Sequence, residues 1–167
     1  MKFRPPTHRV DAPIVFIHPA DEAWDQDKIA ESEKENGEDC PYLRYVAGKT
    51  RYDASEVQHL LKGDPVEFHG KRLGVVQHNE VQSLADREGF QQAWTTRGAY
   101  MQAARYGLHA VKQGGTDVLD LGSPGSLTTV DLEKLRDCSD LGIELIRDIG
   151  RAFYIASQPL RDDEKKP

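Results

Sequence analysis

Residues 117–127, D-V-L-D-L-G-S-P-G-S-L, come closest in this chain to the residue types and spacing of a cofactor site. The apolar run from Val118 to Leu121 predicts a short buried strand, and residues 122–125, G-S-P-G, predict a tight loop. Residues 128–138 then predict a helix. A glycine loop between a strand and a helix N-terminus is the arrangement that binds the phosphates of nucleotide-type cofactors.

The letters V-L-D-L-G in this stretch resemble the first motif of S-adenosylmethionine-dependent methyltransferases. Only 42 residues follow Gly125, too few to complete the doubly wound sheet of that family. Pro124 stands inside the loop and has no N–H to donate. Glu144, 19 residues after Gly125, could stand where such enzymes bind ribose, but residues 141–153 keep helical apolar spacing throughout. We therefore predict that residues 117–127 form a turn between helices and bind no cofactor.

Possible metal ligands are few and scattered. Glu56 and His59 form an E-x-x-H pair, which is half of a di-iron carboxylate site, but no second pair and no further glutamates complete it. His69 and His78 lie nine residues apart, which matches no compact metal spacing. The sequence predicts no metal site.

Signatures of nucleophilic catalysis are also missing. The chain has no G-x-S-x-G elbow, P-loop or dinucleotide fingerprint. Cys40 and Cys138 lack C-x-x-C spacing, which is typical of free thiols in a reducing compartment. We predict no catalytic residue and a protein that is not an enzyme. A small enzyme whose active site is assembled from distant residues remains an alternative.

Length and charge set the protein class. The 167 residues suit one domain, no apolar run reaches membrane-spanning length, and the N-terminus lacks a secretory h-region, so a cytoplasmic location is expected. The formal net charge is −6, and residues 20–40 alone carry −7, with nine acidic residues against two lysines, so the rest of the chain is nearly neutral. No clustered Lys/Arg face predicts nucleic-acid binding. The acidic segment is either a solvated loop or frayed helix, or an arm for a basic partner.

The expected fold class is α+β and mostly helical, with a small N-terminal sheet followed by a helical C-terminal half. We expect one domain, 1–167. Residues 1–11 form a loose arm, residues 42–158 the folded body and residues 159–167 a tail. The acidic segment, residues 20–40, is either ordered or disordered. The expected strands are 14–17, 42–46 and 66–68, and the expected helices are 53–61, 79–89, 90–113, 128–138 and 141–158.

Residues 90–113 predict the longest helix. Its apolar stripe recurs at spacings of four, seven, three, four and three, through Phe90, Trp94, Met101, Ala104, Leu108 and Val111. The same helix carries residue types enriched at protein interfaces, which we take as a candidate partner-binding set: Trp94, Arg97, Tyr100, Arg105 and Tyr106. The alternative is that Trp94 belongs to the core and the tyrosines are half-buried.

Three stretches are similar to the tail assembly chaperones of long-tailed bacteriophages: F-H-G-K-R-L-G-V-V-Q-H-N-E-V-Q-S-L, R-G-A-Y-M-Q-A-A-R-Y-G-L-H-A-V-K-Q and I-E-L-I-R-D-I-G-R-A-F-Y-I-A-S-Q-P-L-R-D-D-E-K-K. The resemblance lies in the Glu80-Val81 pair after a strand, the helix ending at residues 105–108, and residues 157–160 before a charged tail. It covers residues 66–165 and is a pattern of helices without a catalytic signature. The first 65 residues, including the acidic segment, depart from it.

This resemblance implies a phage protein that is a non-enzymatic chaperone in the host cytoplasm. It would bind the hydrophobic tape-measure protein through apolar helix faces until tail-tube subunits displace it, would self-associate, and would need no metal, cofactor, nucleic acid or membrane. Two alternatives stay open. A small acidic host-directed inhibitor would depend on residues 20–40 and bind in a salt-sensitive way. A small S-adenosylmethionine-type enzyme would be stabilised by its ligand.

Overall fold

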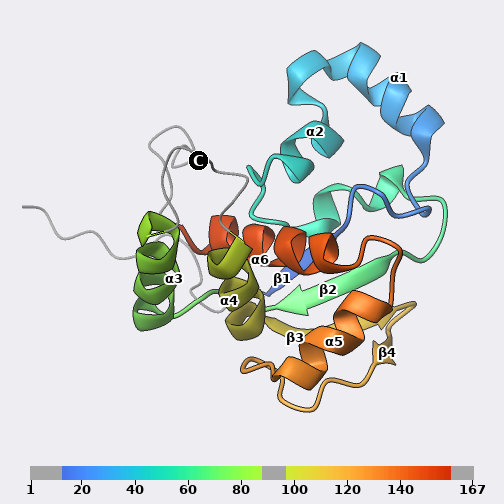
Figure 1. Cartoon of the computed structure of the whole chain (residues 1–167). Helices are drawn as coiled ribbons and strands as arrows, with labels where there is room; N and C mark the ends of the chain where they lie inside the picture. Colours follow the sequence, from blue (N-terminus) through green and yellow to red (C-terminus); the bar gives the residue numbers. More distant parts are fainter. Residues whose placement is uncertain (1–12, 88–96, 159–167) are drawn as a thin grey trace, which may run out of the picture.

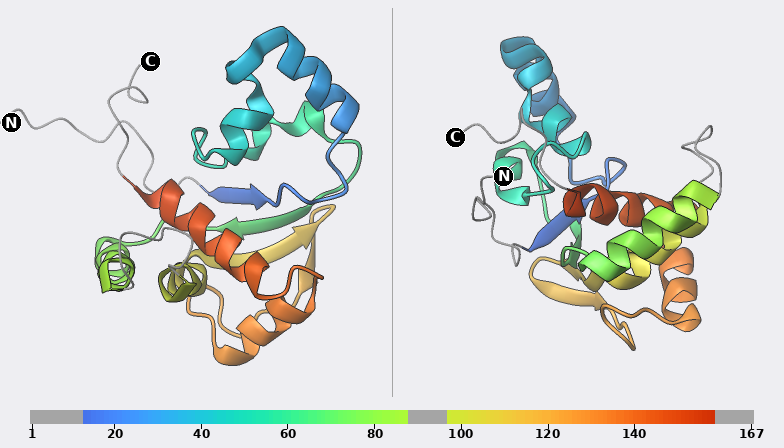
Figure 2. Two further views of the ribbon diagram at one scale, coloured as in Figure 1. Left: turned by 45° about the horizontal axis from the view of Figure 1, so that its top comes forward. Right: turned by 90° about the vertical axis from the view of Figure 1, so that its left-hand side faces the viewer.

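The computed structural model describes residues 13–87 and 97–158, and within them it confirms the α+β, mostly helical class. Four antiparallel strands form one sheet in the order β1-β2-β3-β4, and α4, α5 and α6 cover one face of it (Figures 1 and 2). The elements are β1 Ile14–Ile17, α1 Gln26–Asn36, α2 Pro41–Val46, β2 Val66–Gly70, α3 Val75–Arg87, α4 Arg97–Gly107, β3 Leu108–Gln113, β4 Thr116–Leu119, α5 Thr129–Asp137 and α6 Ile143–Ser157.

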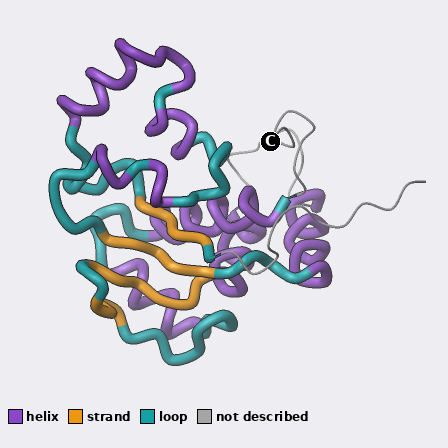
Figure 3. Tube along the Cα trace, turned by 180° about the vertical axis from the view of Figure 1, so that it is seen from behind, coloured by secondary structure: helices purple, strands orange, loops and turns teal. Residues whose placement is uncertain are grey.

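The core lies between the sheet and α6. Phe16, Phe68 and Val111 are aligned across β1, β2 and β3 and are all buried, because alternate residues of a strand point to the same face. The apolar stripe of α6 packs against the core, as its helical spacing predicted. Seen from behind, Figure 3 shows the strands in front and the helices of the C-terminal half behind them.

Helices α4 and α6 cross at very short range. Gly150 of α6 lies against the backbone of Tyr100 in α4, where an added Cβ would stand 1.7 Å from the Tyr100 carbonyl oxygen. The Phe153 ring lies over Gly70 and Gly107, each too close for a Cβ. Glycine at these positions therefore sets how closely α6 approaches α4 and the sheet.

The β1 edge of the sheet is closed by side-chain and backbone contacts. The buried Tyr45 hydroxyl donates to the Val15 carbonyl oxygen at 2.6 Å and accepts from the Ile17 N–H at 2.9 Å. The Val15 N–H donates to the Tyr52 carbonyl oxygen at 3.2 Å. Burial raises the pKa of Tyr45 above its ordinary range, so its hydroxyl stays protonated and keeps its donor role. These contacts use backbone groups that would otherwise be free at a sheet edge.

Replacing Tyr45 by phenylalanine should destabilise the protein by about 1–2 kcal/mol, because it leaves the buried Ile17 N–H and the partly buried Val15 carbonyl oxygen without this partner. Chemical denaturation of the purified variant measures the loss. Tyr42→Phe is the matched control, because Tyr42 belongs to the same helix. Its ring packs edge-on against Trp24, and its hydroxyl makes no hydrogen bond within the described residues. Equal stability of the two variants would show that the Tyr45 hydroxyl does not hold the edge.

Much of the acidic segment forms helix α1, the helical alternative among those expected for residues 20–40. Asp25 caps it by accepting from the Lys28 N–H. Trp24 and Ile29 are buried as the segment's apolar anchors, and the Trp24 indole N–H donates to the His18 carbonyl oxygen at 2.9 Å. Figure 1 shows α1 standing away from the sheet, and the right-hand view of Figure 2 agrees.

The strand predicted at residues 42–46 is wrong. This segment is helix α2, with Pro41 in its first turn, where a proline ring fits a helix without loss of a hydrogen bond. Tyr45, whose residue type favours strands, is held in the helix by its contacts with β1. Tertiary contacts override the strand preference of an aromatic residue here.

The single helix predicted over residues 90–113 is also wrong. Helix α4 ends at Gly107, and β3 begins at Leu108 and turns into β4 through Gly114 and Gly115, both with positive φ. Leu108 and Val111 are buried, as predicted, but on a strand. The sheet thus takes β3 from the segment expected to be helical, whereas β4, Thr116–Leu119, overlaps the short strand that the apolar run from Val118 to Leu121 predicted. Phe90 and Trp94 lie outside the described residues.

Smaller differences affect the predicted helix boundaries. Residues 53–61 form two short 3₁₀ turns in place of a helix, although Asp53 does cap the first by accepting from the Ser55 N–H. Helix α3 begins at Val75, four residues before Asn79, the predicted cap. The arm of residues 1–11 and the tail of residues 159–167 lie outside the described part. None of the described helices is long and apolar enough to cross a membrane.

Candidate functional site

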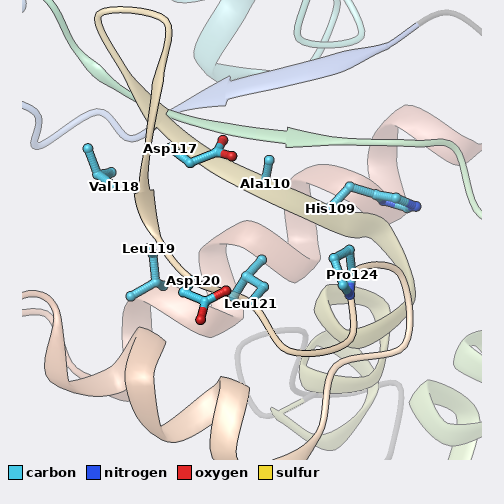
Figure 4. Close-up of a pocket in the computed structure, with 8 residues that line it drawn as sticks. All are labelled: His109, Ala110, Asp117, Val118, Leu119, Asp120, Leu121 and Pro124. Atoms are coloured by element: carbon cyan, nitrogen blue, oxygen red, sulfur yellow. The ribbon is translucent and has the colours of Figure 1, made fainter.

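A cavity of about 330 Å³ lies beside the β3–β4 hairpin (Figure 4). Its lining residues come from β3, from β4 and from the loop that follows β4. They are His109, Ala110, Asp117, Val118, Leu119, Asp120, Leu121 and Pro124. In Figure 4 the Asp117 and Asp120 carboxylates stand on opposite sides of the space. The cavity therefore combines apolar walls with two acidic groups.

The cavity occupies a gap in the sheet ladder. The register between β3 and β4 ends at the pair Val111–Leu119. The chain returns to β3 at Gly125, whose N–H donates to the Leu108 carbonyl oxygen at 2.9 Å. Between these two points His109 and Ala110 have no β4 partner in the register. The loop after β4 therefore bows away from β3 and borders the space, which stays open to solvent.

The loop is held by the buried carboxylate of Asp131, in the first turn of α5. This carboxylate accepts from the Gly122 N–H at 2.7 Å and from the Ser123 N–H at 3.3 Å. It also accepts from the Thr128 N–H and hydroxyl at 3.0 and 3.1 Å, while Thr128 in turn caps the Asp131 N–H. This reciprocal pair is a capping box. One side chain thus joins the glycine loop to the helix that follows it.

Hydrogen bonding keeps Asp131 ionised. Desolvation by burial raises the pKa of its carboxyl, but the hydrogen bonds from Thr128, Gly122 and Ser123 together outweigh burial and lower it. Asp131 is only 1 % exposed, so its negative charge is stabilised by hydrogen bonds from N–H and hydroxyl groups of the chain and not by water.

These contacts explain the stretch that resembled a methyltransferase motif. Its strand is β4, at the edge of an antiparallel sheet, and not the central strand of a parallel one. The prediction of a turn between two helices needs correction, because the loop joins β4 to α5. The Gly122 and Ser123 N–H groups, which a phosphate would need, point at Asp131. The loop's anion-binding groups are filled by the chain's own carboxylate.

The possible metal ligands stay apart. Glu56 and His59 are both exposed on successive 3₁₀ turns. His69 Nε2 lies 2.7 Å from a Glu67 carboxylate oxygen, while His78 stacks on Tyr154 between α3 and α6. Burial, and next the Arg72 guanidinium, lower the pKa of His78. In residues 13–87 and 97–158 no group of three or more His, Cys, Asp or Glu side chains could hold a metal ion.

The predicted partner-binding set is divided by the structure. Trp94 lies outside the described residues, and Arg97 begins α4. Tyr100, Arg105 and Tyr106 are half-buried on this helix, as the alternative interpretation of the tyrosines expected. The Tyr106 hydroxyl donates to a Glu80 carboxylate oxygen at 2.7 Å, and this hydrogen bond raises the pKa of Tyr106. The tyrosines thus already make contacts within the chain.

One histidine–aspartate pair was not foreseen from the sequence. His18 Nε2 donates to an Asp148 carboxylate oxygen at 2.8 Å, and its Nδ1 accepts from the Ala20 N–H at 3.0 Å. Since both ring nitrogens are occupied, the pair ties the end of β1 to α6 and does not activate a nucleophile. Cys40 is buried and donates to the Ser32 hydroxyl, so this thiol is also engaged.

The other functional candidates missed by sequence reasoning are Asp117, Asp120, His109 and Asp131. His109 lies 8 residues before Asp117 and 11 before Asp120, across the hairpin, and only the wrongly predicted helix over residues 90–113 hid their proximity. Asp131 did have a local signal, the T-x-x-D spacing of a capping box. Comparison of the chain with family models, with curated proteins and with solved structures gives no match.

Proposed function

We propose that this protein is a non-enzymatic binding protein, and specifically an assembly chaperone that holds a helical tape-measure protein of a phage tail. One observation carries the proposal: large apolar side chains are exposed on the helical layer, by which we mean α3, α5, α6 and the turn that leads into α6. Their exposed fractions are 78 % for Val75, 80 % for Val76, 59 % for Val130, 38 % for Leu141 and 46 % for Ile143. All five lie within residues 66–165, the part similar to tail assembly chaperones.

Exposed apolar side chains on helices suit a helical partner. Such a partner lays its own apolar face against them, and the free energy gained grows with the apolar area removed from water. Only a few side chains are available here, so the contact would be modest in area and reversible. Reversible binding is what a chaperone needs when its client later joins an assembly.

The test is binding of a helical fragment of the tape-measure protein encoded in the same genome. The double variant Val130→Lys/Ile143→Lys should weaken binding at least about tenfold, because it places two ammonium groups in an apolar contact. Isothermal titration calorimetry measures the affinity. The matched control is Leu43→Lys: Leu43 is an apolar residue, 37 % exposed, on α2 and outside residues 66–165. Unchanged binding by the double variant would contradict the proposed surface.

The acidic helix α1 favours a second candidate, an acidic protein directed at a basic host partner. Its exposed side chains include Asp27, Glu31, Glu33 and Glu35. The two functions separate when the same calorimetric titration is repeated with a basic peptide in place of the tape-measure fragment. Loss of binding in Glu31→Lys/Glu35→Lys, together with steep salt dependence and no effect of the Val130/Ile143 variant, would favour this candidate over the chaperone.

A further inference from the structure

The cavity beside the β3–β4 hairpin has the chemistry of a site for an organic cation. Ala110, Leu119, Leu121 and Pro124 give it apolar walls, and Asp117 and Asp120 contribute two carboxylates. No lysine or arginine is among its lining residues. A ligand that matches these walls needs an apolar stem and a positively charged head.

Two ammonium groups lie near the cavity without lining it. Lys112 is the cross-strand neighbour of Asp117. Lys134 of α5 donates from Nζ to the Asp120 backbone carbonyl oxygen at 2.8 Å, which leaves the Asp120 carboxylate itself available. The walls of the cavity therefore keep their negative charge, although these two lysines reduce the field around it.

His109 adds a hydrogen-bonding group to the wall. Its Nδ1 lies 2.8 Å from the Gly107 carbonyl oxygen, so this nitrogen carries a proton and donates it. In the neutral ring Nε2 is then an acceptor. Gly125 leaves room for this side of the ring, because a Cβ there would stand 2.7 Å from Nε2. In Figure 4 the His109 ring points away from Asp117 and Asp120, so the two carboxylates remain the groups that would recognise a charged head.

We propose that this cavity binds an ammonium or guanidinium group carried on an alkyl chain. Lysine and arginine side chains of a partner protein share this chemistry with free polyamines. The alkyl stem lies along Ala110, Leu121 and Pro124, and the charged head lies between Asp117 and Asp120. The gap in the β3–β4 ladder provides the room. The site is distinct from the exposed side chains of α3, α5 and α6, so either proposal can fail without the other.

The test is NMR titration of the full chain with four probes. Spermidine and agmatine represent the free cations, an acetylated and amidated Gly-Gly-Arg-Gly-Gly peptide represents a side chain, and the same peptide with norleucine lacks the charge. We expect shifts of the Ala110, Asp117 and Leu119 amide signals with the cationic probes. Tighter binding of spermidine or agmatine would identify the ligand as a free cation, and tighter binding of the arginine peptide would identify it as a side chain of a partner protein. Asp117→Asn/Asp120→Asn should weaken binding roughly tenfold, since exposed ion pairs each contribute up to about 1 kcal/mol.

Two further variants separate the cavity from general attraction to an acidic protein. Ala110→Leu should weaken the shifts by occupying part of the apolar wall on which the alkyl stem lies, whereas Glu31→Gln/Glu35→Gln on α1 should leave them unchanged. The proposal is overturned if no cationic probe shifts the cavity signals at 10 mM, or if the norleucine peptide binds as tightly as the arginine peptide. Shifts confined to residues 25–39, or unaffected by Asp117→Asn/Asp120→Asn, would overturn it as well.

Discussion

Replacing Gly150 by alanine should destabilise the protein by more than about 3 kcal/mol, the largest effect we expect from a single methyl group in this chain. The new Cβ would stand 1.7 Å from the Tyr100 carbonyl oxygen and 2.5 Å from its carbonyl carbon. Both atoms belong to the backbone of α4, so no side-chain rotation relieves the clash. Helices α4 and α6 must separate, and this opens the core on both sides of the contact.

The measurement is the midpoint and free energy of unfolding in urea, followed by circular dichroism. Gly63→Ala is the matched control, because a Cβ at Gly63 meets nothing within 4 Å and its φ is ordinary. We expect the control to stay within about 0.5 kcal/mol of the parent. A Gly150→Ala protein as stable as the control would mean that α4 and α6 do not cross at the range described.

Replacing Asp131 by asparagine should cost about 2–3 kcal/mol. Two of the carboxylate's backbone partners, Gly122 and Ser123, lose a charge-assisted hydrogen bond, and an amide in its place turns a donor toward other donors. Because the side chain is buried, water cannot replace the lost bonds. The loop from β4 to α5 should loosen first, which amide hydrogen exchange at Gly122 and Ser123 would detect.

The same carboxylate predicts a pH dependence. Its pKa is lower in the folded protein than the ordinary value of 3.8, so its contribution is present at neutral pH and is lost as the pH falls below 3.8 through the folded pKa. The stability of the parent should therefore decline more steeply in acid than that of Asp131→Asn. Asp140→Asn, at an exposed position, should keep the parent's slope. Parallel acid profiles for all three proteins would show that Asp131 does not titrate as described.

The predicted long helix shows why burial is easier to read from the sequence than secondary structure. Leu108 and Val111 were expected in the core and are there, because their apolar side chains must be buried in either conformation. Their spacing of three looked helical. On β3 the same spacing arises from irregular pairing with β2: the register shifts at His69/Gly70, where His109 has no β2 partner. Such shifts depend on the neighbouring strands and leave no local pattern.

The strand at residues 14–17, the helix starting after Thr128 and the C-terminal helix were predicted for reasons that are local. Proline residues bound the first, and regular apolar spacing marks the last. Helix α2 was not predicted, because its aromatic residues favour a strand. What holds it as a helix is the hydrogen bond between the Tyr45 hydroxyl and the Ile17 N–H, and these two residues are 28 positions apart in the sequence. No window of neighbouring residues contains that contact.

For the candidate site, the sequence indicated the right loop but the wrong chemistry. Glycines 122 and 125 do mark a sharp turn, as they would in a cofactor loop. The Gly122 N–H donates to Asp131, nine residues further on, and the Gly125 N–H donates to the Leu108 carbonyl oxygen. The cavity carboxylates Asp117 and Asp120 could not be placed, since their positions depend on the hairpin that the helical pattern concealed.

The most direct test of the proposed function is hydrogen exchange of the full chain, with and without the tape-measure fragment. Binding through the helical layer predicts slower exchange around Val75 and Val76 in α3, around Val130 in α5 and around Ile143 in α6, with residues 25–39 unchanged. Slower exchange confined to residues 25–39, or no change at any position with saturating fragment, would contradict it.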